Sequence, residues 1–443
     1  MSAQTLRANL GKTLAIWTPE DKEFWRQEGQ AIANINLWIS MPALFLAFAV
    51  WQLWSVVAVN LPALGFKFTP NQLFWLAAAP ALSGATLRIF YSFMVPVFGG
   101  RRWTAISTAS LLIPALGIGI AIQDVRTSYA TFLILALLCG FGGGNFSSSM
   151  ANINFFFPKE RKGSALGLNA GLGNLGVSAV QFMAPLVIAA GVYGPLAGGP
   201  QTVEKAGRAV EIWAQNAAFV WVPFIVIFTL AAWIGMNDIA AAKASVREQM
   251  VIFKRKHNWL MCWLYLGTFG SFIGYSAGFP LLIRNQFPEV NALAYAWMGP
   301  LVGAVIRPFG GWLADKLGGA VVTFWNFVVM TAAVAGVLWF LESRSFAGFF
   351  ACFMLLFLTT GIGNGSTFRM IPMIFPPKEA SPVLGFSAAI AAYGGFFIPK
   401  SYGSSIELTG GPQAALYVFI VFYLTCIALT WWYYSRKGAE MPC

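Results

Sequence analysis

Residues 73–95 read LFWLAAAPALSGATLRIFYSFMV, an apolar run long enough to cross a bilayer that nevertheless contains one charge, Arg88. A shift of 219 residues aligns LSGATLRIFYSFMVPVFGGRRWT with LVGAVIRPFGGWLADKLGGAVVT without a gap, and Arg88 then meets Arg307. Three glycines and a threonine also meet identical residues: Gly84 meets Gly303, Gly99 meets Gly318, Gly100 meets Gly319 and Thr104 meets Thr323. The chain is therefore a tandem repeat with an intramembrane arginine at the same place in each half.

The same shift holds further along the chain. It places Gly142, Gly144 and Asn145 on Gly361, Gly363 and Asn364, and the Pro-Lys-Glu triplet at 158–160 on the triplet at 377–379. Each half is therefore predicted to be a six-helix unit with matching landmarks. We expect these parts: an N-terminal arm (1–35), a first half (36–236), a charged cytoplasmic loop (237–258), a second half (259–434) and a tail (435–443).

The composition indicates an all-α polytopic membrane protein. Of the 443 residues, 58% are hydrophobic and 10% are charged, and the mean hydropathy is +0.67, which excludes a soluble globular protein. Twelve apolar runs are long enough to cross a hydrocarbon core of about 30 Å as helices. We place them at 36–60, 73–95, 104–123, 129–157, 164–193, 216–236, 259–283, 293–314, 320–341, 347–373, 382–404 and 413–434.

Lys and Arg predict the orientation, because positively charged short loops stay in the cytoplasm. With both termini inside, 18 of the 28 Lys and Arg lie on the cytoplasmic side and six lie in outer loops. The net charge of +12 thus reflects topology and contact with the lipid bilayer. A nucleic-acid partner is not expected, because no soluble domain is present to bind one. The polar first 35 residues contain no cleavage pattern of a signal peptide.

Arg88 lies about seven residues from the cytoplasmic end of its span, roughly 10 Å deep at 1.5 Å per residue. A single arginine could extend toward the headgroups. However, a charge inside the membrane costs on the order of 2.5 kcal/mol or more and by default indicates function. The pair at repeat-equivalent positions, Arg88 and Arg307, therefore favours a binding site. Lys400, near the outer end of the eleventh span, we interpret as a side chain that extends to the surface.

Residues 139–178 read CGFGGGNFSSSMANINFFFPKERKGSALGLNAGLGNLGVS, the stretch richest in glycine and asparagine. A glycine inside a helix costs up to about 1 kcal/mol relative to alanine, so their number indicates closely packed helices that slide on their neighbours. The asparagines are hydrogen-bonding groups that need partners in a dry interior: Asn145, Asn152, Asn169 and Asn174. For each asparagine, a satisfied packing amide and a role in the site are both open.

Aromatic residues recur at helical spacing in two spans. Phe48, Trp51 and Trp54 in the first span are more typical of packing than of a ligand wall. In the seventh span, Tyr265 and Phe269 stand among small residues. Such aromatics are usually core residues, although a phenol that faces a cavity can donate a hydrogen bond to an anion.

These motifs resemble those of the bacterial nitrate/nitrite porters of the NarK type, within the major facilitator superfamily. The resemblance covers nearly the whole chain, from NLWIS at 36–40 through FGGRRWT and GTFGSFIG to GGFFIPK. The run GLNAGLGNLGVS is similar to the family's first nitrate signature and is highly specific, whereas GGWLADKLGG resembles a generic loop motif. The resemblance implies a major facilitator fold of 12 helices in two pseudo-symmetric halves with one anion site between them, in the bacterial inner membrane.

The resemblance also implies roles for individual residues. It assigns the two anion-binding arginines, the signature asparagine, the site tyrosine and the pocket phenylalanines to Arg88, Arg307, Asn174, Tyr265, Phe48, Phe146 and Phe269. We expect the glycines of the fifth and eleventh spans to act in the conformational change: Gly167, Gly171, Gly173, Gly176, Gly394 and Gly395. The sequence departs from the family pattern at Ala391 and Tyr393, in place of a glycine and an aliphatic residue, at Arg369, in place of a glutamine, and in a short loop, PPKEASPV.

The sequence therefore predicts a nitrate/nitrite antiporter that works by alternating access around two arginines. Their planar guanidinium forks suit a flat oxyanion. None of the sixteen acidic residues falls in the middle of a span, and His257, the one histidine, lies in the predicted central loop, so a proton has no evident carrier. Exchange is therefore expected, and a proton-coupled nitrate or nitrite symporter is the alternative.

Two other classes of protein fit the sequence less well. A membrane-bound enzyme needs a nucleophile, a base or a metal set, and the five cysteines lie in apolar spans or at the end of the chain without metal-ligand spacing. A sensor would usually add a soluble output domain. We therefore expect a monomeric carrier without cofactor or metal.

Overall fold

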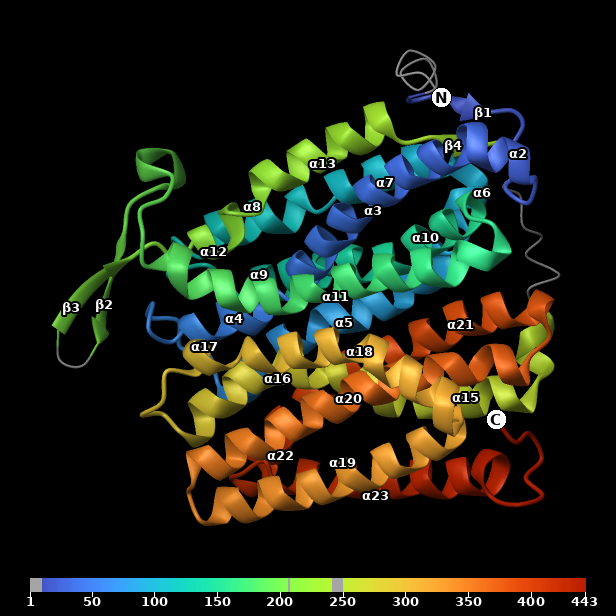
Figure 1. The fold of residues 1–443 in the computed structure, drawn as a ribbon. Coiled ribbons are helices and arrows are strands. Elements are labelled where there is room, and N and C mark those ends of the chain that lie inside the picture. Colours follow the sequence, from blue (N-terminus) through green and yellow to red (C-terminus); the bar gives the residue numbers. More distant parts are fainter. Residues whose placement is uncertain (1–9, 206–207, 241–249) are drawn as a thin grey trace.

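The computed structural model describes residues 10–205, 208–240 and 250–443, so parts of the predicted arm and central loop lie outside the described residues. Within them, twelve helices are long and apolar enough to span a membrane, which confirms the predicted all-helical fold. Figure 1 shows the first half, blue to green, above the second half, yellow to red. Both termini lie at one end of the bundle, here called the terminal end, and a β-hairpin protrudes from the other, here called the hairpin end.

The first half runs from Lys22 to Gly235 and the second from Lys256 to Ser435. The helices of the first half are α2 (Lys22–Phe24), α3 (Gln30–Trp51), α4 (Trp54–Asn60), α5 (Pro70–Tyr91), α6 (Met94–Phe98), α7 (Gly100–Ala109), α8 (Leu112–Ala121), α9 (Tyr129–Leu138), α10 (Gly140–Phe156), α11 (Lys159–Ile188), α12 (Asn216–Phe219) and α13 (Val222–Gly235). Those of the second are α15 (Lys256–Tyr265), α16 (Ser271–Gln286), α17 (Ala292–Tyr295), α18 (Met298–Leu317), α19 (Gly319–Glu342), α20 (Phe346–Ile374), α21 (Pro377–Ala392), α22 (Gly394–Thr409) and α23 (Gln413–Thr430).

Four short strands in the described part of the chain lie outside the bundle. The hairpin of β2 (Gln201–Lys205) and β3 (Arg208–Ile212) is antiparallel, with Val203 opposite Val210. At the terminal end, β1 (Thr13–Leu14) pairs in parallel with β4 (Asp238–Ile239). The second pair joins the beginning of the chain to the segment that follows the first half.

Local sequence explains why the paired landmarks recur. Gly99 ends α6 with φ of 86°, and its repeat partner Gly318 ends α18 with φ of 91°. Side chains with a Cβ rarely adopt this conformation, so glycine is required at both turns. At this turn the repeat found in the sequence is therefore also present in the backbone.

The first membrane helix begins earlier than the apolar run predicts. The carboxylate of Asp21 accepts hydrogen bonds from the backbone N–H groups of Glu23 and Phe24, which caps the helix before Lys22. A π-helical turn at Trp25–Gly29 then leads into α3, and the Trp25 ring packs 5.7 Å from that of Phe157. Hydropathy could not predict this extension, because a side-chain cap and a tertiary contact support it.

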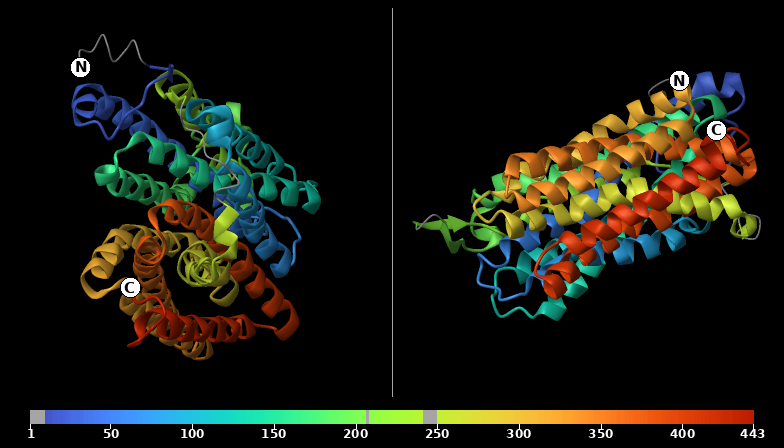
Figure 2. Two further views of the ribbon diagram at one scale, coloured as in Figure 1. Left: turned by 90° about the vertical axis from the view of Figure 1, so that its right-hand side faces the viewer. Right: turned by 90° about the horizontal axis from the view of Figure 1, so that it is seen from below.

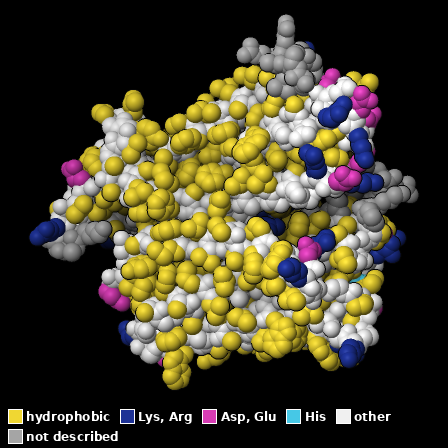
Figure 3. Space-filling view, viewed as in Figure 1, with side chains coloured by type: hydrophobic (Ala, Val, Ile, Leu, Met, Phe, Trp, Pro, Cys, Tyr) yellow, Lys and Arg dark blue, Asp and Glu magenta, His cyan; other side chains and the backbone are white. Residues whose placement is uncertain are grey.

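The two halves meet along a seam. In it α5 packs along α21 and α22, α11 packs on α18, and α4 packs on α16. Figure 2 shows the same division of the halves from the terminal end. Figure 3 shows hydrophobic side chains over the middle of the visible face, with Lys and Arg gathered mainly at the terminal end. This pattern is what a bilayer-spanning bundle requires.

Candidate functional site

Arg88 projects from α5 into the seam and is fully buried, with 0% of its surface exposed. Its Nε donates a hydrogen bond to the carbonyl of Gly143 on α10 at 2.9 Å, and its Nη1 donates to the carbonyl of Ala388 on α21 at 2.8 Å. The second of these bonds crosses from the first half to the second. Arg88 therefore does not extend to the membrane surface, so the sequence alternative of a side chain among the headgroups is wrong.

Three aromatic rings surround the Arg88 guanidinium. Its central carbon lies 4.7 Å from the ring centroid of Phe146, 5.0 Å from that of Trp51 and 5.1 Å from that of Phe269. A cation over an aromatic face is attracted by the ring quadrupole, by up to about 2 kcal/mol or more when it is desolvated. The rings thus stabilise the buried charge and restrict its orientation.

Glycines let the helices approach closely enough to build this arrangement. A Cβ on Gly84 would lie 2.7 Å from Nε1 of Trp51 and 3.1 Å from the backbone of Gly143. Only glycine at both positions leaves space for the indole, whose Nε1 donates to the carbonyl of Pro80 at 2.8 Å. One helical turn beyond Gly84, Arg88 then reaches the Gly143 carbonyl.

Arg307 on α18 is held more loosely. Its Nη2 lies 3.4 Å from the hydroxyl of Tyr265, which itself donates to Oδ1 of Asn364 at 2.8 Å. The Phe368 ring is 5.4 Å from the guanidinium carbon, and 8% of the arginine surface is exposed. Tyr265 and Asn364 therefore form a short chain that positions Arg307.

The two arginines leave donors unused. Nη2 of Arg88 and Nη1 of Arg307 are buried and have no hydrogen-bond partner. None of the ion pairs found in the described part of the chain includes either arginine. The arrangement is therefore a pair of buried, unneutralised cations whose free N–H groups can bind an anion.

The structure brings six of the seven predicted site residues together. Phe146 and Phe269 are nearly parallel, with centroids 6.3 Å apart and planes at 27°, and Tyr265 stacks on Phe269 at 5.5 Å. Phe48 contacts Phe146 edge to face at 6.0 Å. Two van der Waals contacts need about 7 Å, so a flat anion between Phe146 and Phe269 would have to spread the rings slightly.

Asn174, the seventh predicted residue, is buried on α11. Neither polar atom of its side chain has a hydrogen-bond partner among the described residues, so hydrogen bonding does not connect it to the arginines. The packing interpretation, which requires a satisfied amide, therefore does not describe Asn174. Its role in the site stays a prediction.

The six predicted glycines differ in their surroundings. A Cβ on Gly176 would lie 2.2 Å from the carbonyl of Phe45, and one on Gly394 would lie 2.5 Å from the backbone of Gly270. Cβ atoms on Gly173 and Gly395 would each meet side chains at 2.7–2.8 Å. By contrast, a Cβ on Gly167 or Gly171 would meet nothing within 4 Å. Close packing therefore explains four of these glycines in this conformation and leaves two unexplained.

Several residues around the arginines were not predicted from the sequence: the carbonyls of Gly143 and Ala388, and the side chains of Trp51, Asn364 and Phe368. A carbonyl has no signature in a sequence. Asn364 could have been found, because the repeat places it on Asn145. Trp51 had been interpreted as packing, which describes its contacts with the glycines but not its contact with Arg88.

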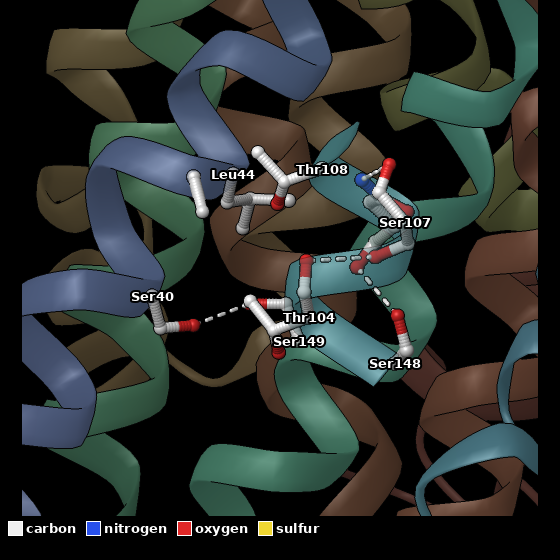
Figure 4. Close-up of a pocket in the computed structure, with 9 residues that line it drawn as sticks. Ser40, Leu44, Thr104, Ser107, Thr108, Ser148 and Ser149 are labelled. Carbon is white, nitrogen blue, oxygen red and sulfur yellow. Dashed lines mark hydrogen bonds between the residues drawn. The ribbon is translucent and has the colours of Figure 1, made fainter. Parts of the chain in front are cut away.

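A small polar cavity lies inside the first half, between α3, α7 and α10 (Figure 4). Its lining residues are Ser40, Ala43, Leu44, Thr104, Ser107, Thr108, Asn145, Ser148 and Ser149. The hydroxyls of Ser40 and Ser149 are 2.8 Å apart, and Nδ2 of Asn145 donates to the carbonyl of Ser107. None of the seven predicted ligand residues lines it, and we interpret it as part of the packing of polar helices.

Comparisons with known proteins agree on the kind of protein. The family described as Major Facilitator Superfamily matches residues 42–399. The nitrate/nitrite transporter NarU of Escherichia coli (strain K12) is 51% identical over 450 residues, with 96% of each chain covered. The probable nitrate/nitrite antiporter NarK2 of Thermus thermophilus is 44% identical over 446 residues, with 99% of this chain and 100% of that chain covered.

Solved structures share the fold. A bacterial homolog of the human lysosomal transporter Spinster, in an inward-facing and occupied conformation, has a TM-score of 0.65 at 15% identity, with 88% of this chain and 95% of that chain covered. A D-xylose-proton symporter has a TM-score of 0.65 at 14% identity, with 90% and 96% covered. At such low identity these two structures support the fold alone.

Proposed function

This chain belongs to the NarK-type nitrate/nitrite porters of the major facilitator superfamily, and on that premise we propose that it exchanges nitrate for nitrite around Arg88 and Arg307. It is a transporter and not an enzyme. The proposal includes nitrate import and nitrite export by alternating access between the halves.

One observation carries the proposal. Each half contributes one buried guanidinium that has an unpaired nitrogen and no carboxylate partner among the described ion pairs. A buried charge is costly unless it is paired, so this pair of cations favours an anion as its missing partner. A guanidinium presents parallel N–H groups in one plane, which match the oxygens of a planar oxyanion such as nitrate or nitrite.

The same charges favour exchange over net transport. Without an anion, Arg88 and Arg307 repel each other in a medium of low dielectric constant. The closed intermediate, in which both arginines surround the site, should therefore form slowly in the empty carrier. A bound anion offsets that repulsion. Return of the carrier would therefore require an anion from the other side of the membrane, which is obligatory antiport.

Proteoliposomes test the coupling directly. We expect rapid uptake of labelled nitrate into liposomes preloaded with nitrite or nitrate, and uptake lower by about 100-fold or more into liposomes without internal anion. Arg307→Gln protein, reconstituted equally, is the control for leak. Accumulation of nitrate in anion-free liposomes under an inward proton gradient alone would overturn antiport and support the symporter.

One observation favours that alternative, proton-coupled uptake. A chain of hydroxyls lies in the second half: the hydroxyl of Tyr423 is 2.7 Å from that of Ser271 and 2.6 Å from that of Tyr275. Hydroxyl groups can relay a proton along such a chain. Tyr275→Phe separates the two functions, because it should abolish proton-driven uptake and leave exchange intact.

The proposal extends to the placement of the protein in the membrane. The terminal end, where Lys and Arg gather in Figure 3, would face the cytoplasm of a bacterial cell, and the hairpin end would face outward. We propose that the protein is a monomer and that its domains are the two six-helix halves and the linker between them. The predicted glycines of α11 and α22 would permit the two halves to move relative to each other.

A further inference from the structure

Away from the arginines, a polar cluster joins the two halves at the hairpin end. Nζ of Lys400 on α22 donates a hydrogen bond to Oδ1 of Asn71 on α5 at 3.0 Å. Nδ2 of the same asparagine donates to a carboxylate oxygen of Glu407 at 2.5 Å. The Lys400 ammonium also lies 4.9 Å from the ring centroid of Trp75, which is again on α5. Two side chains of the first half therefore hold one cation of the second half.

The helices are in close contact at this cluster. A Cβ on Gly403 would lie 2.8 Å from Oδ1 of Asn71 and 2.8 Å from Cβ of Phe74. The rings of Phe74 and Tyr402 contact each other across the same seam, with centroids 6.1 Å apart. The seam between α5 and α22 is therefore closed at the hairpin end.

The cluster lies on the same two membrane spans as Arg88 and Ala388, Pro70–Tyr91 and Pro382–Thr409. Trp75 and Arg88 are both on α5, thirteen residues apart, or roughly 20 Å at 1.5 Å per residue. Lys400 is twelve residues beyond Ala388, the residue whose carbonyl binds Arg88. Lys400 thus lies at the hairpin end of the seam, and Arg88 lies in the same seam deeper in the bundle.

The charge of Lys400 is only weakly compensated. It has no carboxylate within the ion-pair distance in the described part of the chain, and Glu407, which is exposed, reaches it through Asn71. For a carrier that alternates its access, α5 and α22 must part to open this end. Their separation would remove both Asn71 and Trp75 from the ammonium and leave it beside the opening.

We propose that Lys400 is a recruitment site for small monovalent oxyanions on the hairpin side of the membrane. In the closed conformation Asn71 and Trp75 cover it, and in the open conformation it attracts the anion and passes it to the arginines. A single ammonium binds such an anion loosely and raises its rate of arrival, which suits a site that must release its ligand inward. This inference rests on the proposed function.

Membrane vesicles of opposite orientation test it with Lys400→Gln and Lys400→Arg. For anion added at the hairpin side, we expect Lys400→Gln to raise KM about five-fold, to leave kcat nearly unchanged and to weaken the salt dependence of kcat/KM. For anion added at the terminal side, KM should not change. Lys400→Arg keeps the charge and should restore wild-type behaviour.

Asn71→Leu is the matched control, because it removes the hydrogen bond from Lys400 to the first half and leaves the cation in place. Under our proposal it does not raise KM at the hairpin side. If Asn71→Leu and Lys400→Gln instead alter both sides equally, Lys400 only fastens the closed seam and the recruitment site is refuted. An unchanged KM in Lys400→Gln refutes it as well. Failure of wild-type protein to exchange nitrate for nitrite would instead refute the proposed function.

Discussion

Arg88 and Arg307 occupy equivalent positions in the two halves, but their surroundings hold them very differently. Arg88 donates to two backbone carbonyls and contacts three aromatic rings, whereas Arg307 has one long bond to Tyr265 and contacts one ring, that of Phe368. The repeat thus gives the two cations equivalent positions, and the neighbouring helices hold Arg88 by more contacts than Arg307.

The difference follows from substitutions between the repeats. Gly143, whose carbonyl and small size serve Arg88, corresponds to Ile362, and Phe146 corresponds to Gly365. A Cβ on Gly365 would lie 2.4 Å from the carbonyl of Arg307, so no ring can cover that arginine from this position. Under the proposed function, Arg88 would anchor the anion and Arg307 would move to capture and release it.

The largest effect should come from Arg88→Lys and Arg307→Lys, which keep the charge and lose the planar fork. We expect exchange to fall by about 100-fold or more in both. Only Arg88→Lys should also lower stability, by about 2 kcal/mol, because it loses charge-assisted bonds to two helices. Transport in proteoliposomes and thermal unfolding in detergent measure the two effects. A wild-type exchange rate in either variant would refute the two-arginine site. Equal unfolding temperatures of the two variants would refute the role of Arg88 as the more firmly held arginine.

The next prediction compares leucine substitutions at two glycines of α11, Gly176 and Gly171, which should differ in their effects on folding and exchange. Gly176→Leu should prevent folding, because its Cβ would meet the Phe45 carbonyl. A leucine at Gly171 has space in this conformation, so the Gly171→Leu variant should fold and bind nitrate. If the face of α11 that carries Gly171 packs closely in the opposite conformation, the variant should slow exchange by about 10-fold or more. Binding by the purified variant, compared with its exchange rate, tests this. An unchanged exchange rate would show that Gly171 does not act in the conformational change.

Loosening the hold on Arg307 should weaken binding without abolishing it. Tyr265→Phe removes the hydroxyl that contacts Arg307 and Asn364, so we expect about 10-fold weaker nitrate binding. Trp51→Phe is the counterpart at Arg88, and it should cost less than Tyr265→Phe because two carbonyl bonds still hold that arginine. Isothermal titration of both variants compares them. A greater loss in Trp51→Phe would contradict the conclusion that Arg88 is held more firmly than Arg307.

The smallest effect concerns the tail, in which Glu440 contacts Lys256 and His257 of the second half. The hydrogen bond from Lys256, at 2.6 Å, holds the pKa of Glu440 below its usual value, burial opposes this shift, and His257 adds a second lowering contact. Because the folded pKa is lowered, the stabilisation is present above the unfolded pKa of about 4.3 and is lost as pH falls through the folded pKa.

Glu440→Gln should therefore slightly lower the melting temperature at pH 7 and reduce its fall between pH 5 and pH 3. The exposed Glu211→Gln serves as the matched control, with no change expected. A pH profile of Glu440→Gln identical to that of wild-type protein would show that the tail contact does not contribute to stability.

The sequence by itself determined the twelve membrane helices, the repeat and the equivalent positions of the two arginines, because apolar length, charge and glycine turns act locally along the chain. It also placed Tyr265, Phe146 and Phe269 near the arginines by family resemblance. Only the tertiary structure decided that Ala388 of one half accepts from Arg88 of the other, and that Asn71 covers Lys400. Such contacts depend on how the two halves meet, and a backbone carbonyl looks the same in every sequence.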